Sequence, residues 1–205
     1  MNWIHTRIRD FTAKIVPSHE NDNRHCRVLA ARFYFLRVTI MFRRVDLPAR
    51  VSGKLLLHSM PGRYEALERV WHQVRSEAIG AIVCLAEMDE VRQKSAEYAR
   101  ALEVGSVPCS VLQFEIPDRG AADDRVAFWA LAEDIAKRLH AGEAVLIHCA
   151  GGVGRTAMLA ICVLLALGEP ANAARIVISR AGSTIETAPQ RSLISWCESK
   201  VGAKS

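Results

Sequence analysis

The segment that most constrains the fold is a glycine-rich turn between two apolar runs. AVLIHC at residues 144–149 is followed by AGGVGR at residues 150–155 and then by TAMLAICVLLAL at residues 156–167. The first run has the length of a buried strand and the second that of a helix, which Gly168 can end. Such a turn gathers backbone N–H groups at a helix N-terminus, where the helix dipole favours an anion. The sequence therefore predicts an anion-binding loop.

From residue 54 onwards, short runs of strand-forming residues alternate with longer helical stretches. This alternation is typical of α/β domains, because parallel strands are usually connected by helices. Strands are expected at 54–59, 81–87, 110–117 and 144–149, and helices at 63–78, 89–103, from a cap at Asp123 or Asp124 to Gly142, and at 156–167, 171–180 and 189–200. The expected fold is a single α/β domain with a central, mostly parallel sheet flanked by helices.

Residues 1–50 are expected to form a basic, partly helical N-terminal extension. They contain ten Lys/Arg and four Asp/Glu, whereas the chain as a whole has a net charge of +5. Residues 28–45 fit either a helix packed on the core or an interfacial anchor with snorkelling arginines. The basic segment could meet an acidic partner, nucleic acid or an anionic membrane, but it also fits a solvated face without a specific partner.

The sequence also suggests a cellular compartment. No apolar run approaches the roughly 18 to 20 residues that span a bilayer, and the first 20 residues lack the apolar stretch of a signal peptide. The six cysteines are scattered, without a CxxC pair or metal-ligand spacing, which fits a reducing compartment. We therefore expect a cytoplasmic protein without a bound metal or cofactor.

Cys149 and Arg155 lie at the two ends of the predicted loop. The loop N–H groups, the helix N-terminus and Arg155 would stabilise a Cys149 thiolate, which is a nucleophile. The planar guanidinium of Arg155 can hold two phosphoryl oxygens at once. The loop is unlike the nucleotide-binding GxxxxGK[ST] motif, because no lysine lies between Lys137 and Lys200. The residues thus favour nucleophilic attack on a phosphate ester.

Asp118 is the candidate proton donor. It follows the expected strand SVLQFEIP in the loop PDRGAADD, and a carboxylic acid on a mobile loop can protonate a leaving oxygen. Asp beside Pro and Gly also fits an ordinary turn, and Asp123 and Asp124 are better explained as helix caps.

These residues resemble the protein tyrosine and dual-specificity phosphatases, whose motif is HCxxGxxR followed by Ser or Thr. The resemblance covers about residues 54–200, makes residues 51–205 the catalytic domain, and is strongest to compact atypical dual-specificity and kinase-associated phosphatases. It implies that Cys149 forms a phosphocysteine, that Arg155 binds phosphate and that Thr156 hydrogen-bonds the departing thiolate. His148 would tune the cysteine from behind. It also implies that Asp118 is the general acid. The loop residues expected to line the phosphate are Ala150, Gly151, Gly152, Val153, Gly154 and Arg155.

Two further features bear on the substrate. AGSTIETAPQ at 181–190 is similar to a C-terminal motif of small atypical members, which makes Gln190 a candidate for positioning water, although a solvent-facing residue at a helix start fits the pattern equally. The loop lacks lysine, unlike phosphoinositide 3-phosphatases. A compact chain also suggests a shallow cleft that admits phosphoserine and phosphothreonine as well as phosphotyrosine.

The predicted function is therefore a protein phosphatase that works through a phosphocysteine intermediate on a phosphorylated protein. The alternatives are a cysteine-dependent phosphatase of inositol phosphates, nucleotides or RNA 5′ ends, a non-catalytic phosphate-binding module, and a sulfur-transfer or arsenate-reducing enzyme. Cys84 and Cys162 are candidates for a second thiol that protects Cys149 from oxidation, although buried structural thiols are the default. The oligomeric state is left open.

Overall fold

The computed structural model describes residues 42–202. Their centre is a five-stranded sheet in the order β1-β2-β5-β3-β4. The β2–β5, β5–β3 and β3–β4 pairs are parallel, and β1 runs antiparallel to β2. The expected α/β domain with a mostly parallel sheet is thus confirmed. The strands are β1 (Arg43–Val45), β2 (Lys54–His58), β3 (Ile79–Cys84), β4 (Ser110–Gln113) and β5 (Ala144–His148).

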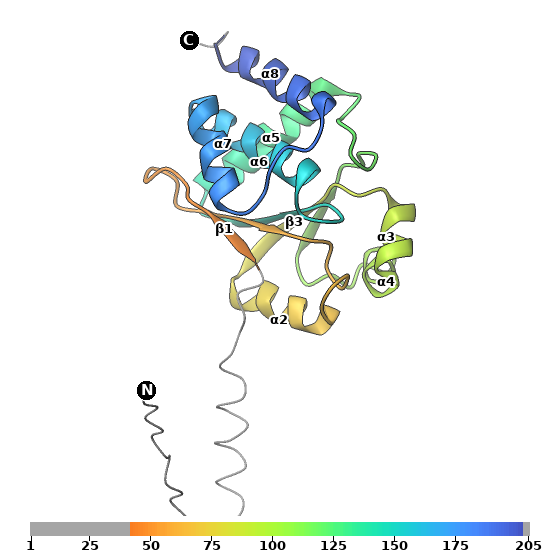
Figure 1. Ribbon diagram of the computed structural model, residues 1–205. Coiled ribbons are helices and arrows are strands. Elements are labelled where there is room, and N and C mark those ends of the chain that lie inside the picture. Colours follow the sequence, from red (N-terminus) through yellow and green to blue (C-terminus); the bar gives the residue numbers. More distant parts are fainter. Residues whose placement is uncertain (1–41, 203–205) are drawn as a thin grey trace, which may run out of the picture. The chain divides into compact units, whose positions relative to one another are not determined.

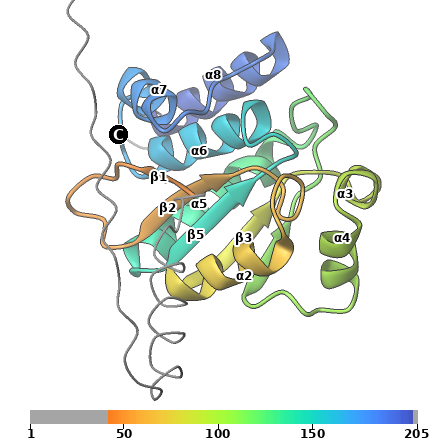
Figure 2. The same cartoon turned by 60° about the horizontal axis from the view of Figure 1, so that its bottom comes forward.

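Seven helices in this described part of the chain cover both faces of the sheet. Helices α5 to α8 lie on one face and α2 on the other, with α3 and α4 beyond the β3 side (Figures 1 and 2). Within residues 42–202, no helix is both long and apolar enough to cross a membrane. The helices are α2 (Leu67–Ser76), α3 (Met88–Lys94), α4 (Ala96–Glu103), α5 (Arg125–His140), α6 (Gly154–Ala166), α7 (Ala171–Arg180) and α8 (Ala188–Gly202).

The central strand β5 is buried on both faces, which explains its unbroken apolar sequence. Val145 and Ile147 belong to the core beneath α5, α6 and α8. Leu146, between them, belongs to the second core with α2 and α4. Side chains alternate across a strand, so β5 contributes to both cores. The strand that leads to Cys149 is consequently fixed from both sides.

Some expected elements differ from those observed. The helix expected at 89–103 is divided into α3 and α4 by Ser95, whose backbone (φ −155°, ψ 83°) is not helical. Arg43–Val45, at the end of the segment considered as a helix, instead forms β1 and pairs with Leu55–Leu57. The sheet thus begins before residue 51, because the partner strand, not local propensity, decides the conformation there. Residues 28–41 of that segment lie outside the described residues.

The helix ends follow the expected local rules. Asp124 caps α5, because its Oδ1 accepts the N–H groups of Val126 at 3.0 Å and Ala127 at 2.9 Å. Gly142 follows the end of α5 with φ 86°. The loops after the carboxyl ends of β2, β3 and β5 all lie at one edge of the parallel sheet, which is where α/β proteins usually place their sites.

Candidate active site around Cys149 and Arg155

The candidate phosphate loop connects β5 to α6, as the sequence predicted. Cys149 is buried, with 4% of its surface exposed, and α6 begins at Gly154. Gly152 has φ 71°, and a Cβ atom there would lie 2.4 Å from the backbone oxygen of His58. Only glycine fits this position, because both the conformation and the lack of space exclude a side chain. The close approach packs the loop against the carboxyl end of β2.

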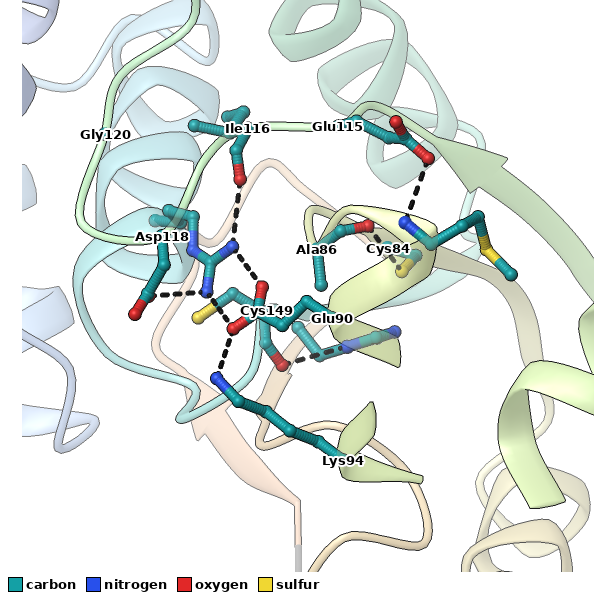
Figure 3. Close-up of polar contacts among 12 residues, drawn as sticks. Cys84, Ala86, Glu90, Lys94, Glu115, Ile116, Asp118, Gly120 and Cys149 are labelled. Atoms are coloured by element: carbon teal, nitrogen blue, oxygen red, sulfur yellow. Dashed lines mark hydrogen bonds and ion pairs between the residues drawn. The ribbon is translucent and has the colours of Figure 1, made fainter. Parts of the chain in front are cut away.

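Arg155 extends from the first turn of α6 into a ring of acceptors. Its Nη1 donates to Glu90 Oε2 at 2.7 Å and to the Ile116 carbonyl at 2.9 Å. Its Nη2 donates to Glu90 Oε1 at 3.0 Å and to Asp118 Oδ1 at 2.9 Å. Figure 3 shows Glu90, Ile116 and Asp118 converging around this guanidinium, with the Cys149 sulfur beside it. The side chain of Arg155 is 2% exposed, so these contacts fix its orientation.

Glu90 was not among the residues that the sequence singled out. Its carboxylate also accepts a hydrogen bond from Lys94, one turn later on α3. Burial acts to raise the pKa of Glu90, but the hydrogen bonds from Arg155 and Lys94 outweigh it and lower the pKa. Burial likewise disfavours the charge on Arg155, yet Glu90 and the neighbouring negative groups raise its pKa. The position of Glu90, shortly after the carboxyl end of β3, was the signal that could have identified it.

Asp118 reaches the same guanidinium from the loop after β4. This loop contains a tight turn, in which Gly120 N donates to the Pro117 carbonyl at 2.8 Å. The side chain of Asp118 is 62% exposed, whereas that of Glu90 is 9% exposed. The fold thus brings Asp118 and Arg155 together across 37 residues of sequence. Of the two carboxylates on Arg155, Asp118 is thus the one in contact with solvent.

His148 lies buried behind the loop. Its Nδ1 is 3.1 Å from the Cys149 carbonyl, and its Nε2 is 2.9 Å from the Tyr98 hydroxyl. Burial lowers the pKa of His148 to about 3, so the ring is neutral. A carbonyl can only accept, and therefore Nδ1 carries the proton and Nε2 accepts from Tyr98. The Cys149 carbonyl thus fixes the tautomer of His148, and Tyr98, which the sequence did not single out, donates to the other ring nitrogen.

Thr156 and Gln190 are both fully buried. The Thr156 hydroxyl has no hydrogen-bond partner among residues 42–202. Gln190 is not solvent-facing, since its Oε1 accepts from Glu186 N at 3.0 Å and its Nε2 donates to the Gly120 carbonyl at 3.2 Å. Gln190 therefore connects the segment before α8 to the loop that carries Asp118.

A pocket adjoins the loop at Gly151. It has a volume of about 360 Å³ and is lined by Arg43, His58, Ser59, Tyr64, Glu65 and Gly151. Arg43, from β1, donates to the carbonyls of Gly152 and Gly182. From its position in the sequence, Arg43 was expected to belong to the basic extension. Its partner Gly152 lies 109 residues away in the chain. No local pattern could have revealed it.

The two thiols considered as protectors of Cys149 are both buried. Cys84, at the end of β3, is in register with His148, the residue before Cys149. Burial raises the pKa of Cys84 to about 11, which keeps it a thiol. Cys162 lies in α6, and burial raises its pKa well above the ordinary value. A protective role for either thiol stays a prediction.

Comparisons with known proteins agree with this architecture. Rat cyclin-dependent kinase inhibitor 3 is 32% identical over 92 residues, which is 43% of this chain and 43% of that protein. A structure of kinase-associated phosphatase, with its catalytic cysteine replaced by serine, superposes with a TM-score of 0.69 at 21% identity, covering 82% of this chain and 98% of that one. Tk-PTP in its active form gives a TM-score of 0.62 at 22% identity, covering 80% and 99%. These two structures show a shared fold.

The family model described as "Polymorphic toxin system, DSP-PTPase phosphatase" matches residues 58–169, which is more than half of the chain. The match runs from the end of β2 through the loop at Cys149 to the end of α6. The chain therefore belongs to this family of dual-specificity and tyrosine phosphatase-type phosphatases.

Proposed function

We propose that this chain hydrolyses phosphate monoesters on protein side chains through a phosphocysteine on Cys149. The observation that carries the proposal is the contact of Asp118 with Arg155 at 2.9 Å. This contact places the candidate acid, Asp118, beside Arg155. Arg155 ends the loop that begins with the candidate nucleophile, Cys149. A non-catalytic binding module would not need a carboxylate at this place, because a carboxylate competes with phosphate for the guanidinium.

The donors of Arg155 explain how phosphate would enter. A guanidinium has five N–H donors, and four of them serve Glu90, the Ile116 carbonyl and Asp118. A two-point grip on phosphate needs one Nη2–H and the Nε–H, which has no acceptor among residues 42–202. Glu90 is nearly buried whereas Asp118 is largely exposed, so phosphate displaces Asp118. The released carboxyl group is then beside the phosphate, where it can donate a proton to the leaving oxygen.

The chemistry then takes two steps. The Cys149 thiolate attacks phosphorus, and the bond to the leaving oxygen breaks as Asp118 donates its proton. In the second step Asp118 removes a proton from water, the water oxygen attacks phosphorus, and the sulfur–phosphorus bond breaks. The hydroxyl of Thr156, which no group in the described part of the chain pairs with, can donate a hydrogen bond to the departing thiolate. Arg155 stabilises the charge on the phosphoryl oxygens in both steps.

The pocket beside the loop supports a protein substrate. Tyr64, which is 66% exposed, contributes an aromatic ring to the pocket, with the Arg63 guanidinium over this ring at 4.6 Å, and Gly151 joins the pocket to the loop. An aromatic face packs well against the ring of phosphotyrosine, and an open pocket also admits the shorter phosphoserine and phosphothreonine. Two relatives are named as a cyclin-dependent kinase inhibitor and a kinase-associated phosphatase, and these names also favour a protein substrate. We propose phosphotyrosine, with phosphoserine and phosphothreonine, as the substrates.

A second candidate substrate is a non-protein phosphate with more than one anionic group. It is favoured by Arg43, a cation that lines the pocket and contacts the loop at Gly152. Hydrolysis of inositol phosphates or nucleotides in preference to phosphopeptides would support it.

The test is hydrolysis of p-nitrophenyl phosphate and phosphopeptides, in the presence of EDTA, by the wild type and Cys149→Ser. Serine in place of the thiolate should abolish turnover while leaving the fold intact. Cys109→Ser is a matched control, because Cys109 lies just before β4, away from the carboxyl ends of the strands. A Cys149→Ser protein that still turned over either substrate would refute the proposal.

A further inference from the structure

Glu186 places a third carboxylate at the phosphate loop. It lies between α7 and α8, and its Oε2 accepts a hydrogen bond from Gly154 N at 3.0 Å. Gly154 is the residue before Arg155 and the first residue of α6. A Cβ atom on Gly154 would lie 2.1 Å from that carboxylate oxygen. Glycine at this position therefore permits the close approach of Glu186.

The segment that carries Glu186 is tied to the loop at several points. Ser183 Oγ donates to the carbonyls of Gly152 at 3.0 Å and Val153 at 3.2 Å. The backbone N–H of Glu186 is held by the buried amide of Gln190, which also bonds to the Asp118 loop at Gly120. These contacts position the carboxylate against the N–H group of Gly154. The position of Glu186 is thus fixed by the hydrogen bonds of its segment as well as by the contact of its own carboxylate.

We propose that Glu186 is an affinity-determining residue, a resident carboxylate that a phosphate group must displace from the N–H of Gly154. The inference rests on the proposed phosphatase function and adds to it. The loop N–H groups and the α6 N-terminus attract anions, and Glu186 satisfies one of these donors with the protein's own negative charge. An incoming phosphate therefore loses one donor to a like charge or must drive Glu186 away.

This contact penalises every phosphate group that enters the loop by a similar amount. Free phosphate binds through the loop alone, so the competition with Glu186 weakens its binding directly. A substrate that also occupies the pocket of Tyr64 and Arg43 gains contacts that offset the loss. Glu186 thus weakens substrate and free phosphate by a similar factor, and free phosphate, which lacks the pocket contacts, is left as the weaker ligand and is released faster.

The test measures binding of tungstate, a phosphate-like oxyanion, by calorimetry in the Cys149→Ser background, where no turnover is needed. Glu186→Gln removes the charge and should tighten tungstate binding on the order of tenfold, because hydrogen bonds to charged groups are the strong ones. Glu198→Gln, an exposed residue of α8 with the same charge change, should leave the affinity unchanged. Glu186→Ala should match Glu186→Gln, which guards against an effect particular to one variant.

In the protein with Cys149 intact, Glu186→Gln should lower KM and the inhibition constant of phosphate by a similar factor, with kcat unchanged. Equal or weaker tungstate affinity in both Glu186 variants would overturn the inference. A large fall in kcat without a change in tungstate affinity would also overturn it, since Glu186 would then act in the chemistry. Failure of the phosphatase proposal would look different, because tungstate would still bind while the intact protein hydrolysed nothing.

Discussion

Glu90 and Arg155 form a two-point ion pair, with Nη1 to Oε2 at 2.7 Å and Nη2 to Oε1 at 3.0 Å. The pair joins α3 to the first turn of α6, and both side chains are almost excluded from solvent. It leaves the Nε–H of Arg155 without a protein acceptor among the described contacts. The pair therefore orients the guanidinium toward the loop before any phosphate arrives.

Replacing Glu90 with Gln should disorder the guanidinium. A neutral amide cannot give the same charge-assisted fork, so we expect kcat/KM to fall about 10- to 100-fold, as for the loss of one or two strong hydrogen bonds. The free energy of unfolding should fall by about 1–3 kcal/mol, because Arg155 keeps its charge in a buried place. Steady-state kinetics and urea unfolding measure both. Glu97→Gln, exposed on α4, is the control, and unchanged kinetics in Glu90→Gln would contradict the orienting role.

Replacing Asp118 with Asn should slow hydrolysis according to the leaving group. General acid catalysis contributes about 10²–10⁴ in rate, and alkyl oxygens need the proton more than p-nitrophenolate does. We therefore expect kcat to fall by about that factor on phosphoserine peptides and much less on p-nitrophenyl phosphate. Asp123→Asn, an exposed residue of the same loop, should have little effect. An equal fall on both substrates would argue that Asp118 acts through the loop structure instead.

Acid should destabilise the protein through His148. Burial lowers its pKa to about 3 in the fold, against about 6.5 in the unfolded chain. Between these values the unfolded state binds the extra proton, so stability is fully present above about pH 6.5 and falls as the pH is lowered toward 3. Well below pH 6.5, the free energy of unfolding falls by about 1.4 kcal/mol per pH unit. The protein should therefore lose about 1 kcal/mol of stability between pH 7 and pH 5.5.

Urea unfolding of wild type and His148→Gln at these two pH values measures this contribution. His148→Gln should lose most of the difference between them, whereas His140→Gln, exposed on α5, should keep it. If the pH dependence were the same in His148→Gln as in the wild type, another group would be responsible.

Replacing Thr156 with Val should separate function from stability. The hydroxyl is buried and has no partner among the described residues, so its removal should leave the free energy of unfolding unchanged or slightly higher. If the hydroxyl stabilises the departing thiolate, the second step should slow on the order of tenfold. A burst of p-nitrophenol followed by slower turnover would reveal the accumulated phosphocysteine. A Thr156→Val protein with normal kcat and no burst would exclude this role.

The sequence determined the fold class and the loop because both depend on local patterns. The apolar runs on either side of the glycines fixed β5 and α6, and the alternation of elements gave the parallel sheet. Within these elements, Asp124 and Gly142 marked the limits of α5 through capping rules that involve only neighbouring residues. Cys149, Arg155 and Asp118 could be chosen because each lies next to a recognisable strand end or turn.

The tertiary structure alone decided which groups surround these residues. Glu90 is 65 residues from Arg155 in sequence, Tyr98 is 50 from His148, and Glu186 is 32 from Gly154. Hydrogen bonds between such residues depend on how loops from different strands meet at one sheet edge, and no local periodicity records that meeting. Arg43 is the extreme case, because β1 takes its conformation from pairing with β2. Local sequence thus determined where the loop lies, and long-range packing determined which charges face it.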